Sequence, residues 1–370
     1  MNPFPRALID LGAIRHNLGV VRRHAPNSRV WAVIKADAYG HGMERVSDTL
    51  EGAQGFAVAR VAEGRRLRDH GVCKPILVLE GPIDAVDLDA AREAQLEIAL
   101  HQTWQVELIE AAARRQTPPS VRVWLKLDTG MHRIGILPGQ LPSLCARLRR
   151  LEPSVSIVGL MTHLANADAA EDPLTARQCE IALSPARQLG LPLSIGNSAG
   201  ILGHPATRTD WVRPGIMLYG GSPLLGRDAE ALGLRPAMTL TSRLMAIQRR
   251  DAGDPIGYGG TYRCPEPMPV GVVGIGYGDG YPRHAPTGTP VLIRGQRAPI
   301  VGRVSMDMIS IDLRGIRDVE VGDPVILWGQ GLPVEDVASK AGTINYELLC
   351  RIAPRVAVEY LNGDIDGPPP

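Results

Sequence analysis

The stretch that decides the fold is Val30-Trp31-Ala32-Val33-Ile34-Lys35-Ala36-Asp37-Ala38-Tyr39-Gly40-His41-Gly42. Residues 30–34 are apolar and rich in β-branched side chains, which predicts a buried strand. Lys35 stands at the carboxyl end of this strand, and small residues and glycines follow at once. In a parallel α/β barrel, the carboxyl ends of the strands meet at the mouth, where functional side chains gather. The stretch therefore predicts a lysine at the mouth of such a barrel.

A lysine at this point loses part of its hydration, which makes its amine a more available nucleophile. Such an amine forms a Schiff base with an aldehyde, and pyridoxal 5'-phosphate (PLP) is the commonest aldehyde cofactor. The alternative is a lysine whose charged end simply reaches the surface, and composition alone favours that alternative.

Apolar runs alternate with helical patterns from residue 30 to about residue 220. The eight strand candidates are residues 30–34, 56–59, 76–79, 97–100, 121–127, 156–161, 193–195 and 211–219, and the helical patterns include 61–69, 103–115 and 174–188. Eight strands that alternate with helices favour an α/β fold, a (β/α)8 TIM-type barrel, over an open doubly wound sheet. No G-x-G-x-x-G opens the first helix, which weakens a dinucleotide-binding interpretation.

Near Arg235 the pattern changes to short strand-like runs divided by Gly, Pro and Asp. These runs are residues 239–247, 269–275, 290–294, 298–304, 308–313, 324–327 and 355–361, with short helices at 334–340 and 346–352. They predict a mainly antiparallel β domain. We therefore expect a barrel domain over residues 1–235, opened by a strand at 6–10, and a β domain over residues 236–370 with a frayed tail.

Composition excludes several classes of protein. The 370 residues include 40 basic and 39 acidic side chains, so no strong field points to nucleic acid or an anionic membrane. The five cysteines are scattered, with no C-x-x-C and no zinc spacing, which predicts reduced thiols and no metal site. We find no apolar leader and no membrane-length run, so we expect a cytoplasmic protein.

Further polar residues follow strand candidates. Lys126, Asp128 and Arg133 surround the end of the run 121–127, and His163 follows 156–161. Each also has an ordinary explanation: the charged residues as rim charges, and the histidine as a hydrogen-bonded core residue. Asn197 and Ser198 stand between a strand and a helix, where Ser198 could cap the helix or its N–H groups could bind an anion.

The motifs as a set, in this order along nearly the whole chain, resemble the alanine racemases, a PLP family of fold type III. The resemblance implies that Lys35 carries PLP. It implies further cofactor contacts from Tyr39, His163, Asn197, Ser198, Arg213, Gly215, Ile216 and Tyr346. Tyr39, Ser198, Tyr346 and the backbone at Gly215 and Ile216 would hold the phosphate. Packing alone is the competing role for Tyr346.

Arg213 is the most informative of these positions. The resemblance puts it, with His163 beside it, at the pyridine nitrogen, where many PLP enzymes have a carboxylate. An arginine cannot accept a proton and disfavours a protonated ring by charge repulsion, which suits proton exchange at Cα and nothing further. The alternative is an arginine that simply precedes a Pro-Gly turn. Arg133 would lie near the substrate carboxylate, and many members carry a carbamylated lysine at the position of Lys126.

The β domain supplies the other half of the implied site. Racemisation removes the Cα proton from one face and returns one to the other, so two bases on opposite faces suffice. Lys35 would serve one face and Tyr258 the other. The resemblance gives Met306 a backbone contact to the substrate carboxylate, with Tyr277 at the entrance and Asp307 alongside. Hairpin turns explain these segments equally well.

The resemblance thus implies interconversion of L- and D-alanine, which supplies D-alanine for peptidoglycan, in a homodimer with shared active sites. Some members have Cys where this chain has Ser305, and the Met-Asp pair after it is intact. Two alternatives stay open. A fold-type-III decarboxylase would have a glutamate at the position of Arg213 and a catalytic cysteine, and a non-catalytic PLP-binding protein would lack the second domain.

Overall fold

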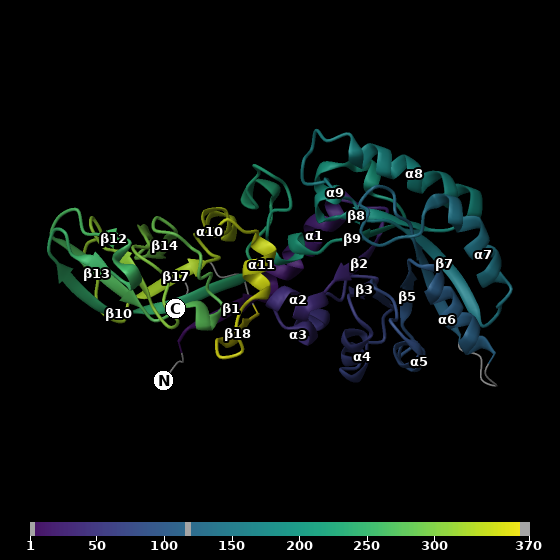
Figure 1. Ribbon diagram of the computed structural model, residues 1–370, viewed down its shortest axis with the longest axis horizontal. Coiled ribbons are helices and arrows are strands. Elements are labelled where there is room, and N and C mark those ends of the chain that lie inside the picture. Colours follow the sequence, from purple (N-terminus) through teal and green to yellow (C-terminus); the bar gives the residue numbers. More distant parts are fainter. Residues whose placement is uncertain (1–3, 115–119, 363–370) are drawn as a thin grey trace.

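The computed structural model describes residues 4–114 and 120–362 and has two parts, a barrel and a sheet domain (Figure 1). Eight parallel strands close the barrel in chain order, with β2 hydrogen-bonded to β9. They are β2 (Arg29–Val33), β3 (Gly55–Val58), β4 (Ile76–Val78), β5 (Glu97–Leu100), β6 (Val121–Lys126), β7 (Val155–Met161), β8 (Leu193–Asn197) and β9 (Trp211–Arg213). All eight coincide with predicted runs, so the barrel prediction is confirmed.

Helices surround the barrel (Figure 1). They are α1 (Leu11–His24), α2 (Lys35–Gly40), α3 (Met43–Thr49), α4 (Val61–Asp69), α5 (Ala85–Glu93), α6 (Thr103–Ala113), α7 (Leu141–Arg149), α8 (Leu174–Leu189) and α9 (Ser198–Gly203). Inside the barrel, Trp31 stacks on Trp211 with ring centroids 4.4 Å apart, and Trp124 meets both rings edge-on. These indoles fill the barrel interior with apolar surface.

Two predicted ranges in the barrel are too long. The run 211–219 is a strand only to Arg213, because Pro214 and Gly215 break the ladder, and Ile216–Tyr219 forms the 3-10 turn η3. Helix α6 ends at Ala113, and position 115 of the predicted helix lies outside the described residues.

The second part is an eight-stranded, mainly antiparallel sheet, which confirms the predicted β domain. Its strands are β1 (Arg6–Asp10), β10 (Met238–Arg250), β13 (Met268–Val273), β14 (Pro290–Ile293), β15 (Gln296–Pro299), β16 (Ile309–Asp312), β17 (Pro324–Trp328) and β18 (Ala357–Leu361). The predicted run 298–304 therefore ends early, at Pro299. A separate two-stranded ribbon joins β11 (Pro255–Ile256) to β12 (Tyr262–Arg263).

The first strand lies in this sheet and not with the barrel. β1 pairs antiparallel with β10 and parallel with β18, so strands from both ends of the chain lie side by side. Two helices, α10 (Val334–Ala341) and α11 (Asn345–Cys350), cover the junction between the two parts (Figure 1). α11 lies against α2, and a side chain at Gly40 would overlap the Leu349 carbonyl oxygen. The carboxyl-terminal third of the chain thus reaches the barrel mouth.

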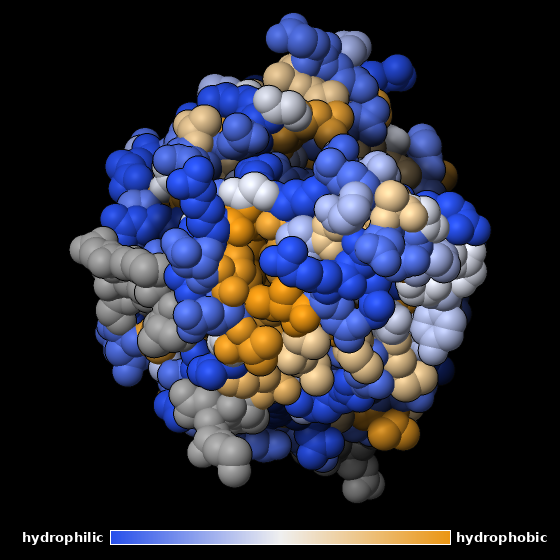
Figure 2. Space-filling model, turned by 90° about the vertical axis from the view of Figure 1, so that its left-hand side faces the viewer, coloured by the Kyte–Doolittle hydropathy of each residue, from blue (hydrophilic) through white to orange (hydrophobic). Residues whose placement is uncertain are grey.

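Figure 2 shows the sheet end of the molecule, where apolar residues gather in the middle and hydrophilic residues surround them. Exposed apolar side chains of this part include Met245 and Met308. None of the helices in the described ranges is long and apolar enough to cross a membrane.

Candidate active site

A cavity of about 740 Å³ opens at the carboxyl ends of the barrel strands. Eleven of the residues singled out in the sequence line it, namely Lys35, Tyr39, Lys126, Arg133, His163, Asn197, Ser198, Arg213, Gly215, Ile216 and Tyr346. They come from five barrel strands or the loops after them and from α11, so the fold brings together what the sequence separates. Cations and hydroxyl groups predominate among them, and this composition suits anionic ligands.

Lys35 begins a turn of unusual handedness. From Ala36 to Tyr39 the four φ angles are 53–54°, so α2 is a left-handed turn between β2 and α3. Each such residue with a side chain costs roughly 1–2 kcal/mol relative to a right-handed one. Strain of this kind persists only where surrounding contacts hold it, and here it sits directly beside the lysine.

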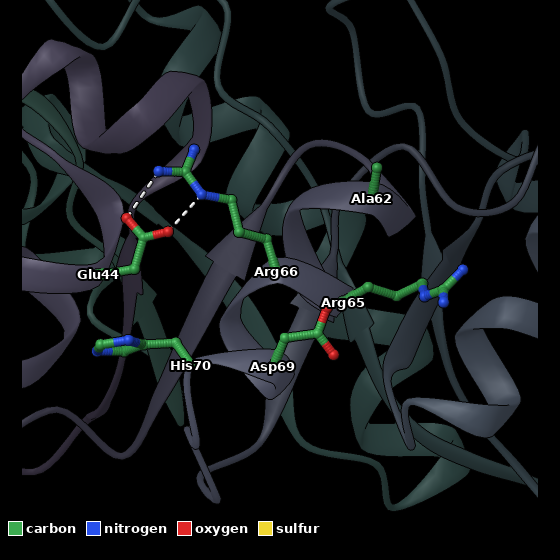
Figure 3. Close-up of a pocket in the computed structure, with 6 residues that line it drawn as sticks. All are labelled: Glu44, Ala62, Arg65, Arg66, Asp69 and His70. Carbon is green, nitrogen blue, oxygen red and sulfur yellow. Dashed lines mark hydrogen bonds and ion pairs between the residues drawn. The ribbon is translucent and has the colours of Figure 1, made fainter.

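Carboxylates hold the turn from outside the barrel. Glu63 of α4 accepts a hydrogen bond from the Ala36 N–H at 2.7 Å, and Asp37 accepts one from the Met43 N–H at 3.1 Å. Figure 3 shows Arg66 of α4 reaching Glu44 of α3, and the same guanidinium lies 3.1 Å from Asp37. The Arg66–Glu44 pair lines the hollow drawn in Figure 3, and the contact of Arg66 with Asp37 connects this pair to the turn.

His41 holds the turn from inside. It is fully buried, and its Nδ1–H donates to the carbonyl oxygens of Ala38 at 3.0 Å and Tyr39 at 2.9 Å. Burial lowers the pKa of His41 to about 4, so the ring is neutral at pH 7. The Tyr39 ring stacks on Tyr219 at 4.7 Å, which fixes the hydroxyl of Tyr39 in the cavity.

Ser198 does not cap α9, contrary to the capping interpretation of the sequence. The cap is Asn197, whose Oδ1 accepts the Gly200 N–H at 2.9 Å. The Ser198 hydroxyl instead accepts the N–H groups of Gly215 at 2.9 Å and Met217 at 3.3 Å. Its own proton is thereby directed away from these donors and is available to an anion.

Two phenols complete this corner of the cavity. A Cβ at Gly215 would lie 2.5 Å from the Tyr39 hydroxyl, so only glycine leaves room for that group. The Tyr346 ring lies 6.1 Å from the Tyr39 ring. Burial raises the pKa of Tyr39 and raises that of Tyr346 to about 12, so both phenols keep their protons at neutral pH and can donate. Together with Ser198 they form a cradle for a group such as a phosphate.

Arg213 is held rigidly at the cavity floor. Its Nη1 donates to the Ser194 carbonyl oxygen at 2.9 Å and to the Ser194 hydroxyl at 2.6 Å, and its Nη2 donates to the carbonyl oxygens of Thr162 at 2.5 Å and Ile195 at 3.2 Å. Arg213 as a whole residue is 3% exposed, and burial lowers its pKa to about 10. It still carries its charge at neutral pH.

The surrounding cations change the titration of their neighbours. Burial, then the charges of Arg213, Arg133 and Lys35, lowers the pKa of Lys126 to about 7. Burial, then the positive charges of Arg213, Lys126 and other cations, holds the pKa of His163 well below its usual range, so its imidazole is neutral. So strong a lowering makes His163 a weak base, and its supporting role stays a prediction.

Comparison with known proteins decides the family. The model of the alanine racemase N-terminal domain matches residues 9–223, and that of the C-terminal domain matches residues 237–360. The alanine racemase of Halorhodospira halophila is 50% identical over 98% of this chain and all of that protein, and that of Nitrosococcus oceani is 51% identical over 95% of this chain and 98% of that protein. This chain belongs to the alanine racemase family.

The solved structures agree with this assignment. The biosynthetic alanine racemase of Pseudomonas aeruginosa superimposes with a TM-score of 0.93 at 44% identity, covering 98% of this chain and all of that one. The family resemblance found in the sequence is therefore confirmed, and the chain is an isomerase.

Four predicted site residues of the family do not line this cavity. Tyr258, Tyr277, Met306 and Asp307 all lie in the β domain, and the first three are 68%, 40% and 53% exposed. A single chain therefore presents the barrel half and the β-domain half of the predicted site as separate surfaces. Tyr258 does not line the cavity of its own chain, and its predicted pairing with Lys35 across two copies stays a prediction.

Sequence reasoning missed other lining residues, chiefly His101 and Glu80. His101 donates from Nε2 to the Glu80 carbonyl oxygen at 2.9 Å, while within the described chain its buried Nδ1 has no partner. His101 follows the run 97–100, so its place after a strand was the available signal. Trp104 and Ile83 add an exposed apolar rim to the mouth.

Proposed function

We propose that this enzyme interconverts L- and D-alanine, with PLP bound covalently to Lys35 and with Lys35 and Tyr258 as the two bases. The observation that supports this most strongly is a lysine at the mouth of a cavity whose lining includes three further cations and three hydroxyl groups. We further propose that the enzyme is a cytoplasmic homodimer, that its D-alanine supplies peptidoglycan, and that the domains meet at residues 235 and 236.

The residues present fit PLP. The cofactor carries a phosphate, a phenolic oxygen and an aldehyde, and the cavity offers a hydroxyl cradle, cations and an amine. The missing Cβ at Gly215 leaves the space that the Tyr39 hydroxyl occupies, and the Ser198 proton is free to donate. When bound, PLP supplies an electron-withdrawing system that acidifies the Cα hydrogen of an amino acid.

Arg213 favours racemisation over the rival decarboxylation. Its guanidinium is fixed by donating to four backbone and hydroxyl oxygen atoms, so it cannot turn away from the cavity. It can donate to a ring nitrogen but cannot be protonated by it. A shallow electron sink favours return of a proton to Cα over further chemistry, which supports the racemase.

Lys35 and Tyr258 would each hold or accept the Cα proton on one face, while Arg133 orients the substrate carboxylate. Since the site halves are separate in one chain, we propose that Tyr258 and Met306 cover the cavity of a second copy. Their exposure supports this, because both side chains are accessible to a second copy.

We also propose that Lys126 orients Arg133. Because the pKa of Lys126 is about 7, its side-chain amine is neutral in a large share of molecules at pH 7. Only a neutral amine adds to carbon dioxide. A carbamate on Lys126 would put a negative charge among Arg133, Arg213 and Lys35 and so relieve their mutual repulsion.

Two measurements test the reaction. Borohydride reduction and peptide mapping should find the pyridoxyl label on Lys35, and a label elsewhere refutes the cofactor assignment. In deuterated buffer, L-alanine should exchange its Cα hydrogen and give D-alanine without release of carbon dioxide. Release of carbon dioxide would favour the decarboxylase instead.

Complementation tests the shared site. Lys35→Ala and Tyr258→Phe variants should each be nearly inactive, and equal amounts mixed through unfolding and refolding should recover roughly a quarter of wild-type activity. This fraction follows because half of the dimers are mixed and each mixed dimer has one intact site. No recovery in demonstrated mixed dimers would show that each site lies within one chain.

A further inference from the structure

Arg355 links two turns of the β domain, the one that carries Tyr277 and the one that carries Met306. It precedes β18, and its Nε donates to Asp279 Oδ1 at 2.6 Å while its Nη2 donates to Asp307 Oδ1 at 2.5 Å. The Asp279 side chain is 1% exposed, whereas those of Arg355 and Asp307 are about half exposed. One guanidinium thus links a buried carboxylate to a surface carboxylate.

The two turns fit each other closely. The Tyr277 N–H donates to the Ser305 carbonyl oxygen at 3.0 Å, and the Gly278 N–H donates to the Met306 carbonyl oxygen at 2.8 Å. A side chain at Gly276 would overlap both of these carbonyl oxygens. The turn that carries Met306 therefore has one position relative to the turn that carries Tyr277.

Asp279 fixes the arginine. Its Oδ2 accepts the Gly276 N–H at 2.8 Å, and its carbonyl oxygen accepts the Ala353 N–H at 3.1 Å. A buried carboxylate with these partners cannot move without losing them. Asp279 therefore sets the place of Arg355, and Arg355 in turn sets the place of Asp307.

The adjoining backbone N–H is available to a ligand. Within the described residues the Met306 N–H donates no hydrogen bond, and the neighbouring Ser305 N–H is taken by the Met308 carbonyl oxygen at 2.9 Å. A carboxylate ligand at Met306 would meet the negative charge of Asp307 unless that charge were balanced. The hydrogen bonds to both carboxylates raise the pKa of Arg355, so its balancing charge is permanent.

We infer that Arg355 is a positioning residue for substrate binding: it neutralises Asp307 and holds it aside, so that the Met306 N–H can receive the carboxylate of alanine. This inference rests on the proposed function, in which Met306 covers the cavity of a second copy. Arg355 itself does not touch the substrate, so its effect is on affinity for carboxylates and not on proton transfer.

The test compares Arg355→Ala, Asp307→Asn and the double variant. Arg355→Ala should raise the KM for L-alanine and the inhibition constant of propionate, a carboxylate without an amine, each about tenfold, or about 1.4 kcal/mol. The kcat should fall by less than threefold. Asp307→Asn leaves the Arg355 charge unopposed and should lower both constants, and adding it to Arg355→Ala should restore most of the lost affinity, because it removes the unbalanced negative charge.

The matched control is Arg314→Ala, which also removes an arginine held by two carboxylates, Asp312 at 2.7 Å and Glu266 at 2.5 Å. It should leave both constants unchanged. Thermal unfolding of each variant separates loss of fold from loss of affinity, since a merely structural role would not be rescued by Asp307→Asn. The inference is overturned if Arg355→Ala binds propionate as tightly as the wild type, or if the double variant binds propionate no more tightly than Arg355→Ala. If the wild type does not racemise alanine, the proposed function fails and this inference fails with it.

Discussion

Replacing Gly215 with alanine tests the anion cradle most directly. The added methyl would lie 2.5 Å from the Tyr39 hydroxyl oxygen and 3.2 Å from the ring carbon that carries it. Ordinary contact needs about 3.5 Å, so the hydroxyl must shift by about 1 Å. The Tyr39 ring is 7% exposed and stacks on Tyr219, so the shift takes the hydroxyl out of the cradle. Losing one hydrogen bond to a charged group costs about 1.5–3 kcal/mol, which predicts a PLP dissociation constant roughly 10- to 150-fold higher.

The assay is titration of the apoprotein with PLP, followed by protein fluorescence. Gly203→Ala is the matched control, because its methyl would meet only Leu224 at 3.4 Å and the Ala167 carbonyl at 3.9 Å. Tyr39→Phe should weaken binding by a similar factor, and the Gly215→Ala change should add little to it, since both remove the same hydrogen bond. Two results would contradict this explanation. One is a Gly215→Ala protein that binds PLP within twofold of the wild type. The other is a Gly215→Ala/Tyr39→Phe protein whose loss of binding free energy equals the sum of the two single losses.

Three further outcomes are expected. Burial gives Lys126 a folded-state pKa of about 7 against an unfolded value near 10.5, so between these pH values the folded protein binds fewer protons than the unfolded one. Lys126→Met should therefore raise the unfolding temperature of the apoprotein most near pH 7 and less at pH 9. A rise in unfolding temperature that grows with pH would contradict the lowered pKa. Gly42 has φ at 85° and an added Cβ would overlap the Tyr360 hydroxyl, whereas Gly71 has φ at 97° and no atom within 4 Å of an added Cβ. Gly42→Ala should therefore lower the free energy of unfolding by about 2 kcal/mol more than Gly71→Ala. Equal losses in chemical denaturation would contradict the overlap. Tyr258→Phe should slow Cα exchange mainly for one enantiomer in deuterated buffer, and unchanged rates in both directions would exclude the two-base mechanism.

The barrel could be predicted from sequence because its signal is local and repeated. Each strand is a short apolar run, and a functional residue at its carboxyl end needs no long-range information once the barrel is assumed. For this reason Lys35, Lys126, His163 and Arg213 were all expected at one mouth, and all line one cavity.

What could not be predicted depends on contacts distant in the chain. The left-handed turn after Lys35 has no glycine in its four central positions, and Glu63 and Arg66 of a later helix hold it. Asn197 and Ser198 are equally good caps by residue type, and only the N–H groups near Gly215 decide which one serves. The place of β1 in the second sheet follows from its partners β10 and β18, which lie more than 200 residues away.

The side-by-side arrangement of β1 and β18 affects how this protein can be divided. The sheet domain is assembled from both extremities of the polypeptide, so a fragment that starts at residue 236 lacks an interior strand and leaves the neighbouring edges without hydrogen-bond partners. Truncation into residues 6–10 or 357–361 would disturb the same group of three paired strands, β10, β1 and β18. A β domain made alone therefore needs the β1 segment supplied as a peptide or joined by a tight turn to the start of β10, because β1 runs antiparallel to β10 and Ile9 lies opposite Met238.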